Sequence, residues 1–372
     1  MKGRILALLA ALLCLLCACA RREDAPQSAA EPEGYLPLEY AEEFSVAYYP
    51  GGAALLTVGE DRFVLLENGA QIPQGLETLP AIQLPLQNLY VASSSVMDLF
   101  CALDALDCVG MTSTKAADWA IPEVREAVEN EAIAFVGKYS APDFERVLES
   151  DCPLVVENTM IYHNPDIKER LEALGIPVLV ERSSYETHPL GRLEWIKLYG
   201  LLVGKTEQAR SYFDEQTAQL SSVLGAEDSG KTAAFFYIGA NGVANVRTPG
   251  DYVSKMIELA GGHYVFSDLP VEEGSRSTMN MQMEAFYAGA VDADVLIYNA
   301  TVDGGVDSIA QLLEKSELLA RFKAVQNGNV WCTEQNMFQQ TSGISGMIAD
   351  LHAIFSGAAD DADALTYLYR LH

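Results

Sequence analysis

Side chains suited to binding a small molecule recur in the loops that follow the strands expected from this sequence. Arginine binds anionic oxygens through paired hydrogen bonds, aromatic rings cover apolar faces, and methionine adapts to irregular outlines. Ligands of parallel sheets bind at the carboxyl ends of the strands, so these loops supply the candidate ligand-binding residues. They are Ser94, Tyr139, Tyr162, Arg182, Tyr185, Asn241, Arg247, Met337 and Phe338. An alternative role for Arg182 and Arg247 is pairing with neighbouring acids such as Glu181 and Asp251.

The histidines and the known short motifs predict neither a metal site nor a catalytic site. None of the five histidines lies three or four residues from another. His163 and His188 follow successive strands and could approach one cleft, but loop or cap positions are the alternative. The stretch Gly200–Thr206 differs from a phosphate-binding loop because only three residues separate its glycines. We therefore predict no metal, no cofactor and no catalytic residue.

The N-terminus has the pattern of an export signal. Lys2 and Arg4 precede an apolar run, Ile5–Ala18, that is shorter than the roughly 20 residues needed to span a bilayer. The run ends in Leu16-Cys17-Ala18-Cys19, which resembles the bacterial lipobox, whose last cysteine is lipidated. A cleaved signal peptide with incidental cysteines is the alternative. We predict lipidation at Cys19, with the protein held on the outer face of the cytoplasmic membrane by that anchor alone.

The composition is that of a large folded protein. The chain has 372 residues, of which 49% are apolar, and its net charge is -28. Such an acidic excess repels phosphate backbones, so nucleic acid is excluded as a partner. Seven cysteines are too few for a disulfide scaffold. Residues 20–37 are rich in Ala, Glu, Pro and Arg without an apolar period, which predicts a tether.

Alternating strand and helix patterns predict an α/β fold. Short antiparallel strands are expected within residues 44–67. Strand and helix patterns then alternate from Leu89 to Val180 and again from Ala233 to Cys332. This alternation predicts two Rossmann-like lobes with parallel sheets, preceded by a short antiparallel β segment.

One long helix is expected to join the two lobes. Pro189–Val203, capped by Thr187, and Thr206–Leu224 both have helical patterns, and Gly204 separates them. The predicted order is a signal peptide at 1–18, a tether at 19–37, a β segment at 38–85, an N-terminal lobe at 86–204, a linking helix at 205–226 and a C-terminal lobe at 227–372.

This pattern resembles the class III substrate-binding proteins of ABC importers, which serve iron-siderophore, haem and cobalamin uptake. The resemblance covers roughly Leu86 to Phe355. It rests on three stretches: Val91-Ala-Ser-Ser-Ser, Val136-Gly-Lys-Tyr-Ser140 with the helix that follows it, and Ile257-Glu-Leu-Ala-Gly-Gly262. In that family one acid on each lobe pairs with arginines of the permease. Glu145 and Glu284 fall at the corresponding helix positions, so the resemblance implies that they dock the permease; stabilisation of the helix N-terminus is the alternative.

The resemblance implies a binding protein that captures a metal chelate between its lobes and delivers it to an ABC permease and its ATPase. A ferric siderophore is the expected ligand, with cobalamin or haem as the alternative. A bare ion is disfavoured because the histidines and cysteines do not cluster. Two other classes stay open: an exported enzyme with an unrecognised active site, and a surface adhesin, which would more typically show repeats.

Overall fold

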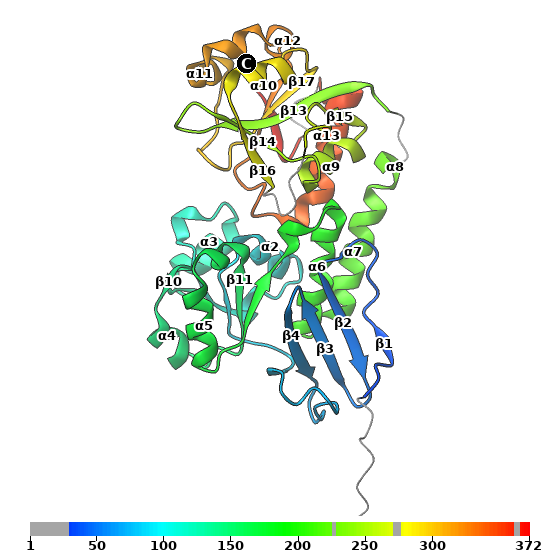
Figure 1. Cartoon of the computed structure of the whole chain (residues 1–372), viewed down its shortest axis with the longest axis vertical. Helices are drawn as coiled ribbons and strands as arrows, with labels where there is room; N and C mark the ends of the chain where they lie inside the picture. Colours follow the sequence, from blue (N-terminus) through cyan, green and yellow to red (C-terminus); the bar gives the residue numbers. More distant parts are fainter. Residues whose placement is uncertain (1–29, 225–227, 271–276, 361–364) are drawn as a thin grey trace, which may run out of the picture.

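The computed structural model describes residues 30–224, 228–270, 277–360 and 365–372, and it has two lobes stacked along its long axis (Figure 1). The expected signal peptide, Cys19 and most of the expected tether lie outside the described residues, as do the last residues of the expected linking helix. Within the described ranges, none of the helices has the length and apolar character needed to cross a membrane.

A five-stranded sheet precedes the lobes, as the alternation at 44–67 predicts. Its strands lie in the order β1 (Gly34–Tyr35), β2 (Phe44–Tyr49), β3 (Ala53–Val58), β4 (Asp61–Leu66) and β5 (Ala81–Gln83). Neighbours are antiparallel, except that β5 runs parallel to β4. Gly51 and Gly52, with φ of 81° and 84°, make the turn between β2 and β3 in a conformation that other residues rarely adopt.

The N-terminal lobe has a wholly parallel sheet. Its order is β12 (Val178–Glu181), β11 (Val155–Asn158), β6 (Leu89–Val91), β7 (Val109–Thr112) and β8 (Ala134–Phe135). The connecting helices are α2 (Ser94–Ala102), α3 (Pro122–Glu129), α4 (Phe144–Glu149) and α5 (Pro165–Ala173), and a small hairpin, β9 (Gly137–Lys138) with β10 (Ala141–Pro142), precedes α4. The strands are short and almost continuously buried, as expected for a sheet covered on both faces.

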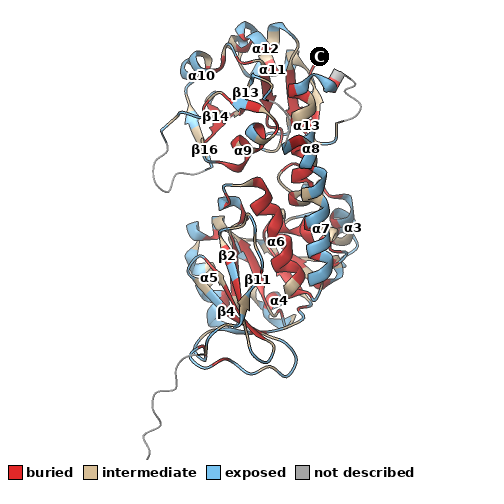
Figure 2. Ribbon diagram, turned by 90° about the vertical axis from the view of Figure 1, so that its right-hand side faces the viewer, coloured by how far each residue is buried: buried red, intermediate tan, exposed pale blue. Residues whose placement is uncertain are grey.

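Two consecutive helices in the middle of the chain, α6 and α7, differ in how far they are buried. α6 (Pro189–Leu202) is buried on nearly all sides, whereas α7 (Thr206–Gln219) has an exposed outer face (Figure 2). The cap of α6 differs from the prediction: His188, not Thr187, accepts the hydrogen bond from the Leu190 amide at 3.2 Å. The pattern expected as one helix to Leu224 is divided at Leu220, and α8 (Ser221–Leu224) continues toward the C-terminal lobe.

The C-terminal lobe has a mixed sheet. Its order is β16 (Thr278–Met281), β14 (Ala244–Arg247), β13 (Lys231–Ile238), β17 (Val295–Tyr298), β18 (Val330–Thr333) and β19 (Leu368–Arg370), and β15 (Gly262–Tyr264) also pairs with β13. β13, β15, β17 and β18 are parallel, as expected, but β14, β16 and β19 are antiparallel to their neighbours. The helices are α9 (Tyr252–Leu259), α10 (Met283–Ala290), α11 (Ile309–Lys315), α12 (Lys323–Gln326) and α13 (Ile344–Ser356).

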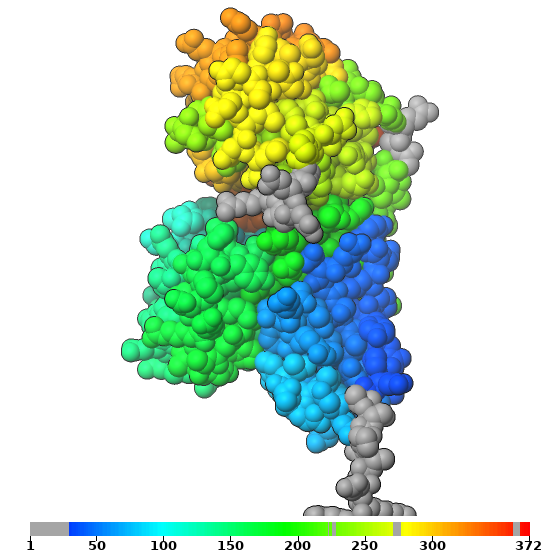
Figure 3. Space-filling view, in the orientation of Figure 1, coloured from blue at the N-terminus to red at the C-terminus, as the bar shows by residue number. Residues whose placement is uncertain are grey.

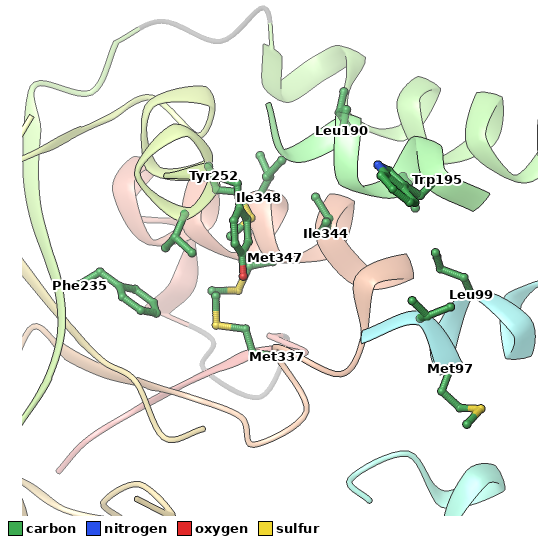
Figure 4. Close-up of a cluster of buried hydrophobic side chains, with 14 of the residues drawn as sticks. Met97, Leu99, Leu190, Trp195, Phe235, Tyr252, Met337, Ile344, Met347 and Ile348 are labelled. Atoms are coloured by element: carbon green, nitrogen blue, oxygen red, sulfur yellow. The ribbon is translucent and has the colours of Figure 1, made fainter. Parts of the chain in front are cut away.

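One hydrophobic core runs from the N-terminal sheet through both lobes. In Figure 4, Leu99 of α2 and Trp195 of α6 lie on one side of the junction, and Tyr252 of α9, Met337 and Ile344 lie on the other. The lobes therefore share buried apolar surface where they meet.

A buried carboxylate of α6 fixes the segment before β2, residues 39–41, to this helix. Glu194 of α6 is fully buried; it accepts hydrogen bonds from the backbone amides of Glu39, Tyr40 and Ala41 at 2.8 to 3.0 Å. Its second partner is the Lys197 ammonium group at 2.7 Å. The segment that carries the first sheet is thus held to the N-terminal lobe by charge-assisted hydrogen bonds.

Candidate ligand-binding cleft

A loop of the C-terminal lobe, residues 334–343, reaches across to the N-terminal lobe, and we name it the bridging loop. The Gln339 amide accepts a hydrogen bond from the Ala120 backbone at 2.8 Å and donates one to the Asp118 carbonyl at 2.9 Å. The Thr341 hydroxyl donates to the Ser95 carbonyl at 2.7 Å. These contacts hold the two lobes together where the surface narrows between them (Figure 3).

Asp98 of α2 adds a further inter-lobe hydrogen bond. Its carboxylate accepts from the backbone amide of Ser342 at 2.7 Å. Burial raises the pKa of Asp98, while the hydrogen bond from Ser342 opposes that change. The bridging loop therefore ends on a buried acid of the opposite lobe.

A cavity of about 490 Å³ lies between the lobes beside the bridging loop. This volume falls in the range of small-molecule sites. The N-terminal lobe contributes Ala120 and Arg125, and the other lining residues are Gly304, Asp307, Thr333, Glu334, Gln335, Asn336 and Tyr369. Most of the C-terminal residues follow the carboxyl ends of β17 and β18, as the rule for parallel strands predicts. None of the nine ligand-binding residues predicted from the sequence lines this cavity.

Sequence reasoning missed Arg125, which is exposed and donates from its Nε to the Trp119 carbonyl at 2.9 Å. Its helix, α3, begins with Pro122 and was not anticipated. The proline at the first helical position was the available signal for that helix.

The structure brings together three of the predicted residues at the carboxyl ends of β11 and β12. Tyr162 and Tyr185 are 47% and 49% exposed, and the Arg182 guanidinium lies 4.6 Å from the centre of the Tyr185 ring. Met160, 50% exposed, belongs to the same loop as Tyr162 but was not predicted individually. These exposed side chains form an aromatic surface on the N-terminal lobe.

Arg182 pairs with an acid that is distant in sequence. Its Nε lies 2.6 Å from Oε2 of Glu43, the residue that precedes β2, and Arg182 is not paired with Glu181. Burial lowers the pKa of Arg182, but hydrogen bonds to Glu43 and Tyr162 outweigh that effect and raise it. Glu181 instead accepts from the Ser183 amide at 2.6 Å.

Arg247 shows the alternative that the sequence left open, an ion pair with Asp251. The guanidinium NH1 lies 3.5 Å from Asp251 Oδ2, and Arg247 is only 6% exposed. Phe338 of the bridging loop places its ring 4.7 Å from the same guanidinium, and Met337 is buried beside it. Contact of Arg247, Met337 and Phe338 with a ligand stays a prediction.

The other predicted contacts lie apart from these groups. Ser94 is the half-buried first residue of α2. Tyr139 is in the β9–β10 hairpin and packs against the apolar cluster that includes Val147. Asn241 is exposed in the β13–β14 turn, where its side chain accepts from the Val243 amide at 3.2 Å, a typical turn interaction.

Glu145 and Glu284 occupy matching places, each exposed at the second position of a helix. Their helices, α4 and α10, lie far from the lobe junction, α4 low on the N-terminal lobe and α10 at the top of the C-terminal lobe (Figure 1).

In the described ranges, no group of three or more His, Cys, Asp and Glu side chains is placed to hold a metal ion. The described cysteines, Cys101, Cys108, Cys152 and Cys332, are free thiols.

Two α/β lobes with a cleft between them define a bilobal binding protein. Residues 90–336 match the model of the periplasmic binding protein family. The chain therefore belongs to this family.

Two curated relatives are uncharacterised lipoproteins from Methanocaldococcus jannaschii. One is 25% identical over 270 residues, which cover 71% of this chain but 63% of that relative. The other is 23% identical over 356 residues, covering 90% of this chain and 86% of the relative. This chain thus spans less than two thirds of the first relative's length.

Solved structures share the fold. The periplasmic haem-binding protein of Vibrio cholerae has a TM-score of 0.58 at 17% identity, covering 71% of this chain and 98% of that one. A ferric hydroxamate transport protein of Saccharomonospora viridis gives 0.57 at 19% identity, with coverages of 73% and 93%. The vitamin B12-binding protein of Vibrio cholerae gives 0.51 at 15% identity, with coverages of 74% and 99%.

Proposed function

We propose that this protein is the solute-binding component of an ABC importer, which captures a metal chelate between its lobes and delivers it to a permease and its ATPase. The observation that carries the proposal is the cavity of about 490 Å³ lined by both lobes, in a member of the periplasmic binding protein family. Proteins of the same fold are described as binding haem and vitamin B12 and as part of a ferric hydroxamate transport system.

A ferric siderophore suits the cavity best. Arg125, Asp307, Glu334 and Asn336 give its lining many hydrogen-bonding groups. The oxygen atoms of a chelate can accept hydrogen bonds from Arg125 and Asn336, and its amide or hydroxyl groups can donate to Asp307 and Glu334. The exposed rings of Tyr162 and Tyr185 favour the second candidate, a flat macrocycle such as haem or a corrinoid.

A fluorescence titration tests the proposal. Ferric siderophores, haem, cobalamin and free Zn²⁺ are added separately while quenching of tryptophan emission is measured; Trp119 lies next to the cavity residue Ala120. We expect saturable quenching by at least one chelate. Arg125→Gln should weaken it about tenfold, the loss of one charged hydrogen bond. Arg321→Gln, an exposed position outside the cavity lining, is the matched control and should bind normally.

Two outcomes would contradict the proposal. Tight binding of free Zn²⁺ with no response to any chelate would replace the chelate by a bare ion. Chemical turnover of the bound chelate would favour the exported enzyme.

Lipid anchoring at Cys19 is part of the same proposal. Two relatives named as lipoproteins and the Leu-Cys-Ala-Cys sequence support it. A Cys19→Ser protein should move to the soluble exported fraction, since the anchor provides the membrane attachment. Persistent membrane association of that variant would refute the assignment.

Permease docking through Glu145 and Glu284 is supported by their exposed, matching positions on the two lobes. Reversing both charges to lysine should abolish transport and leave chelate affinity unchanged. Lysine at Glu149 and Glu314, exposed acids on α4 and α11, is the control and should permit transport. Loss of affinity in the first double variant would move those acids into the ligand site.

A further inference from the structure

The segment 365–372 supplies part of the wall of the cavity between the lobes. Its strand, β19, lies at the edge of the C-terminal sheet, antiparallel to β18, with Tyr369 opposite Cys332. Tyr369 is half-buried and is one of the residues that line the cavity. The segment lies beyond residues 90–336, which match the family model. The cavity therefore depends on a side chain from outside the matched part of the chain.

Hydrogen bonds to a buried acid fix the path of this segment. Asp350 of α13, which is 7% exposed, accepts from the backbone amides of Thr366 and Tyr367 at 3.0 Å and 2.6 Å. The Tyr367 carbonyl in turn accepts at 2.9 Å from the amide of Glu334, the first residue of the bridging loop. The segment is thus tied to α13 and also to a residue that lines the cavity.

The same segment holds a second part of the cavity wall, the loop at residues 304–307. The Tyr369 hydroxyl donates to the Val306 carbonyl at 3.1 Å. Just beyond the loop, the Ile309 amide donates to the backbone oxygen of His372, also at 3.1 Å. Two residues of this loop line the cavity. The position of that wall therefore depends on contacts made by the segment 365–372.

Tyr369 presents a neutral ring to the cavity. Burial raises the pKa of its hydroxyl well above the ordinary value, and the adjacent Cys332 thiol and the Glu334 and Asp307 carboxylates raise it further. Because phenolate formation is opposed, the side chain is not an anion at neutral pH. What it offers a ligand is the shape and the apolar surface of an aromatic ring.

We propose that the segment 365–372 determines which chelates fit the cavity: the Tyr369 ring sets the space available to the ligand, and its hydroxyl holds the loop at 304–307 in place. The proposal rests on the function proposed above and deepens it, because it assigns the selection among chelates to their size. One methylene group in a pocket is worth about 10–200-fold in discrimination, so a whole ring in the wall is a strong determinant.

Variants of one tyrosine separate the ring from the hydroxyl. Tyr369→Ala removes the ring and enlarges the cavity, whereas Tyr369→Phe removes the hydroxyl alone. Tyr49→Ala and Tyr49→Phe are the matched controls, because Tyr49 is also a half-buried strand residue but lies outside the cavity lining. Tyr369→Leu, which keeps apolar packing, takes the place of Tyr369→Ala if that variant does not fold.

The first measurement needs no chelate. Cys332 is fully buried opposite Tyr369, so loss of the ring should connect the cavity to its thiol. We expect iodoacetamide to label Cys332 much faster in Tyr369→Ala than in the wild type or Tyr49→Ala, with the labelled peptide identified by mass spectrometry. Cys152, buried in the N-terminal lobe, should react as slowly as in the wild type, which shows that the fold is intact. A Cys332 that stays equally unreactive would overturn the role of Tyr369 as a wall.

Hydrogen exchange tests the hydroxyl, again without a chelate. Tyr369→Phe leaves the Val306 carbonyl without its donor, so the amides of residues 304–309 should exchange faster than in the wild type. Tyr49→Phe should leave their exchange unchanged. Equal protection of these amides in Tyr369→Phe and the wild type would overturn the positioning of the loop by Tyr369.

The last measurement is a binding titration with two ferric trihydroxamates that differ by one added benzoyl group. Tyr369→Ala should shift the ratio of the two affinities by about tenfold or more toward the bulkier chelate, whereas Tyr369→Phe and Tyr49→Ala should keep the wild-type ratio. A purely structural role would weaken both chelates by the same factor, and that result would overturn selection by size. If the wild type binds neither chelate, the proposed transport ligand is wrong, and the labelling and exchange results still decide the role of the segment.

Discussion

Two glutamates in the same lobe are both fully buried, yet their surroundings differ completely. Glu194 of α6 has an ammonium partner and three backbone amides. Within the part of the chain that the structure describes, neither carboxyl oxygen of Glu157 in β11 has a hydrogen-bond partner, and the buried hydroxyl of Tyr90 on the neighbouring strand has none either. Burial raises the pKa of Glu157 to about 8, and the nearby backbone of Asn158 opposes that rise only in part.

The difference shows that burial alone does not determine what an acid contributes. Around Glu194, the chain supplies enough donors to keep a charge in the interior, and the N-terminal segment is fixed as a result. Around Glu157, the chain supplies too few hydrogen-bond donors, so the carboxyl group is mostly protonated at neutral pH. Its ionisation at higher pH then lowers the free energy of unfolding.

Removing the partnered acid should have the largest effect. Glu194→Leu leaves three backbone amides without their acceptor and the buried Lys197 charge with only the Pro37 carbonyl at 3.2 Å, and we expect a loss of about 3–5 kcal/mol in the free energy of unfolding. Urea denaturation measures it. Adding Lys197→Met should restore part of the stability, because the unpaired charge is then gone. A loss below about 1 kcal/mol would mean that water replaces the carboxylate.

Replacing the unpartnered acid should stabilise the protein. The pKa of Glu157 is higher in the folded chain than the ordinary 4.5, so its favourable contribution is complete below pH 4.5 and is lost as pH rises to about 8. Glu157→Gln removes that loss and should raise the free energy of unfolding by about 3 kcal/mol at pH 7. Denaturation at pH 5 and pH 8 provides the check, with exposed Glu149→Gln as control. If the free energies of unfolding of Glu157→Gln and the wild type differ by the same amount at pH 5 and pH 8, Glu157 does not titrate between these pH values.

Asp98 is an intermediate case, a buried acid with one backbone donor from the opposite lobe. Asp98→Ala leaves the Ser342 amide unpaired and should cost about 1–3 kcal/mol. Hydrogen exchange should show faster exchange at the Ser342 amide than in the wild type. Unchanged protection there would mean that the rest of the bridging loop suffices to hold the lobes.

The smallest effect is expected at the half-exposed pair of Arg182 and Glu43. Their side chains are 23% and 25% exposed, and such pairs contribute less than about 1 kcal/mol. Glu43→Gln should therefore change stability very little in thermal denaturation. It should also free the Arg182 guanidinium, so an altered affinity for an anionic chelate would place Arg182 in the ligand site.

The regular elements of the fold could be predicted because their side chains are buried in simple patterns. β17, Val295–Tyr298, was expected with the bounds it has, since it is a continuous apolar run between polar residues. β14 and β16 were missed: Ala-Asn-Val-Arg and Thr-Met-Asn-Met are short, partly polar strands near the sheet edge. The antiparallel part of the second sheet was therefore not expected.

The site was harder to predict because its contacts join distant parts of the chain. The sequence places the candidate contacts in the loops at the strand ends, but the partner of Arg182 is Glu43, and the cavity is lined by Arg125 of one lobe and Glu334 of the other. No local pattern reports such pairs. Nor does the run Val155–Asn158 indicate that Glu157 has no partner, since that depends on every element packed against it.

Because the hydrophobic core continues across the lobe junction, separating the lobes exposes buried apolar surface and costs free energy. Each 100 Å² of apolar surface exposed there costs about 2.5 kcal/mol, and the hydrogen bonds of Gln339 and Thr341 must break as well. Thermal fluctuation alone will open such a joint rarely, so a tightly held ligand leaves slowly. α4 lies at the lower left side of the N-terminal lobe and α10 at the top of the C-terminal lobe, both away from this joint (Figure 1). A force applied at these two helices would act on the joint through a long lever arm.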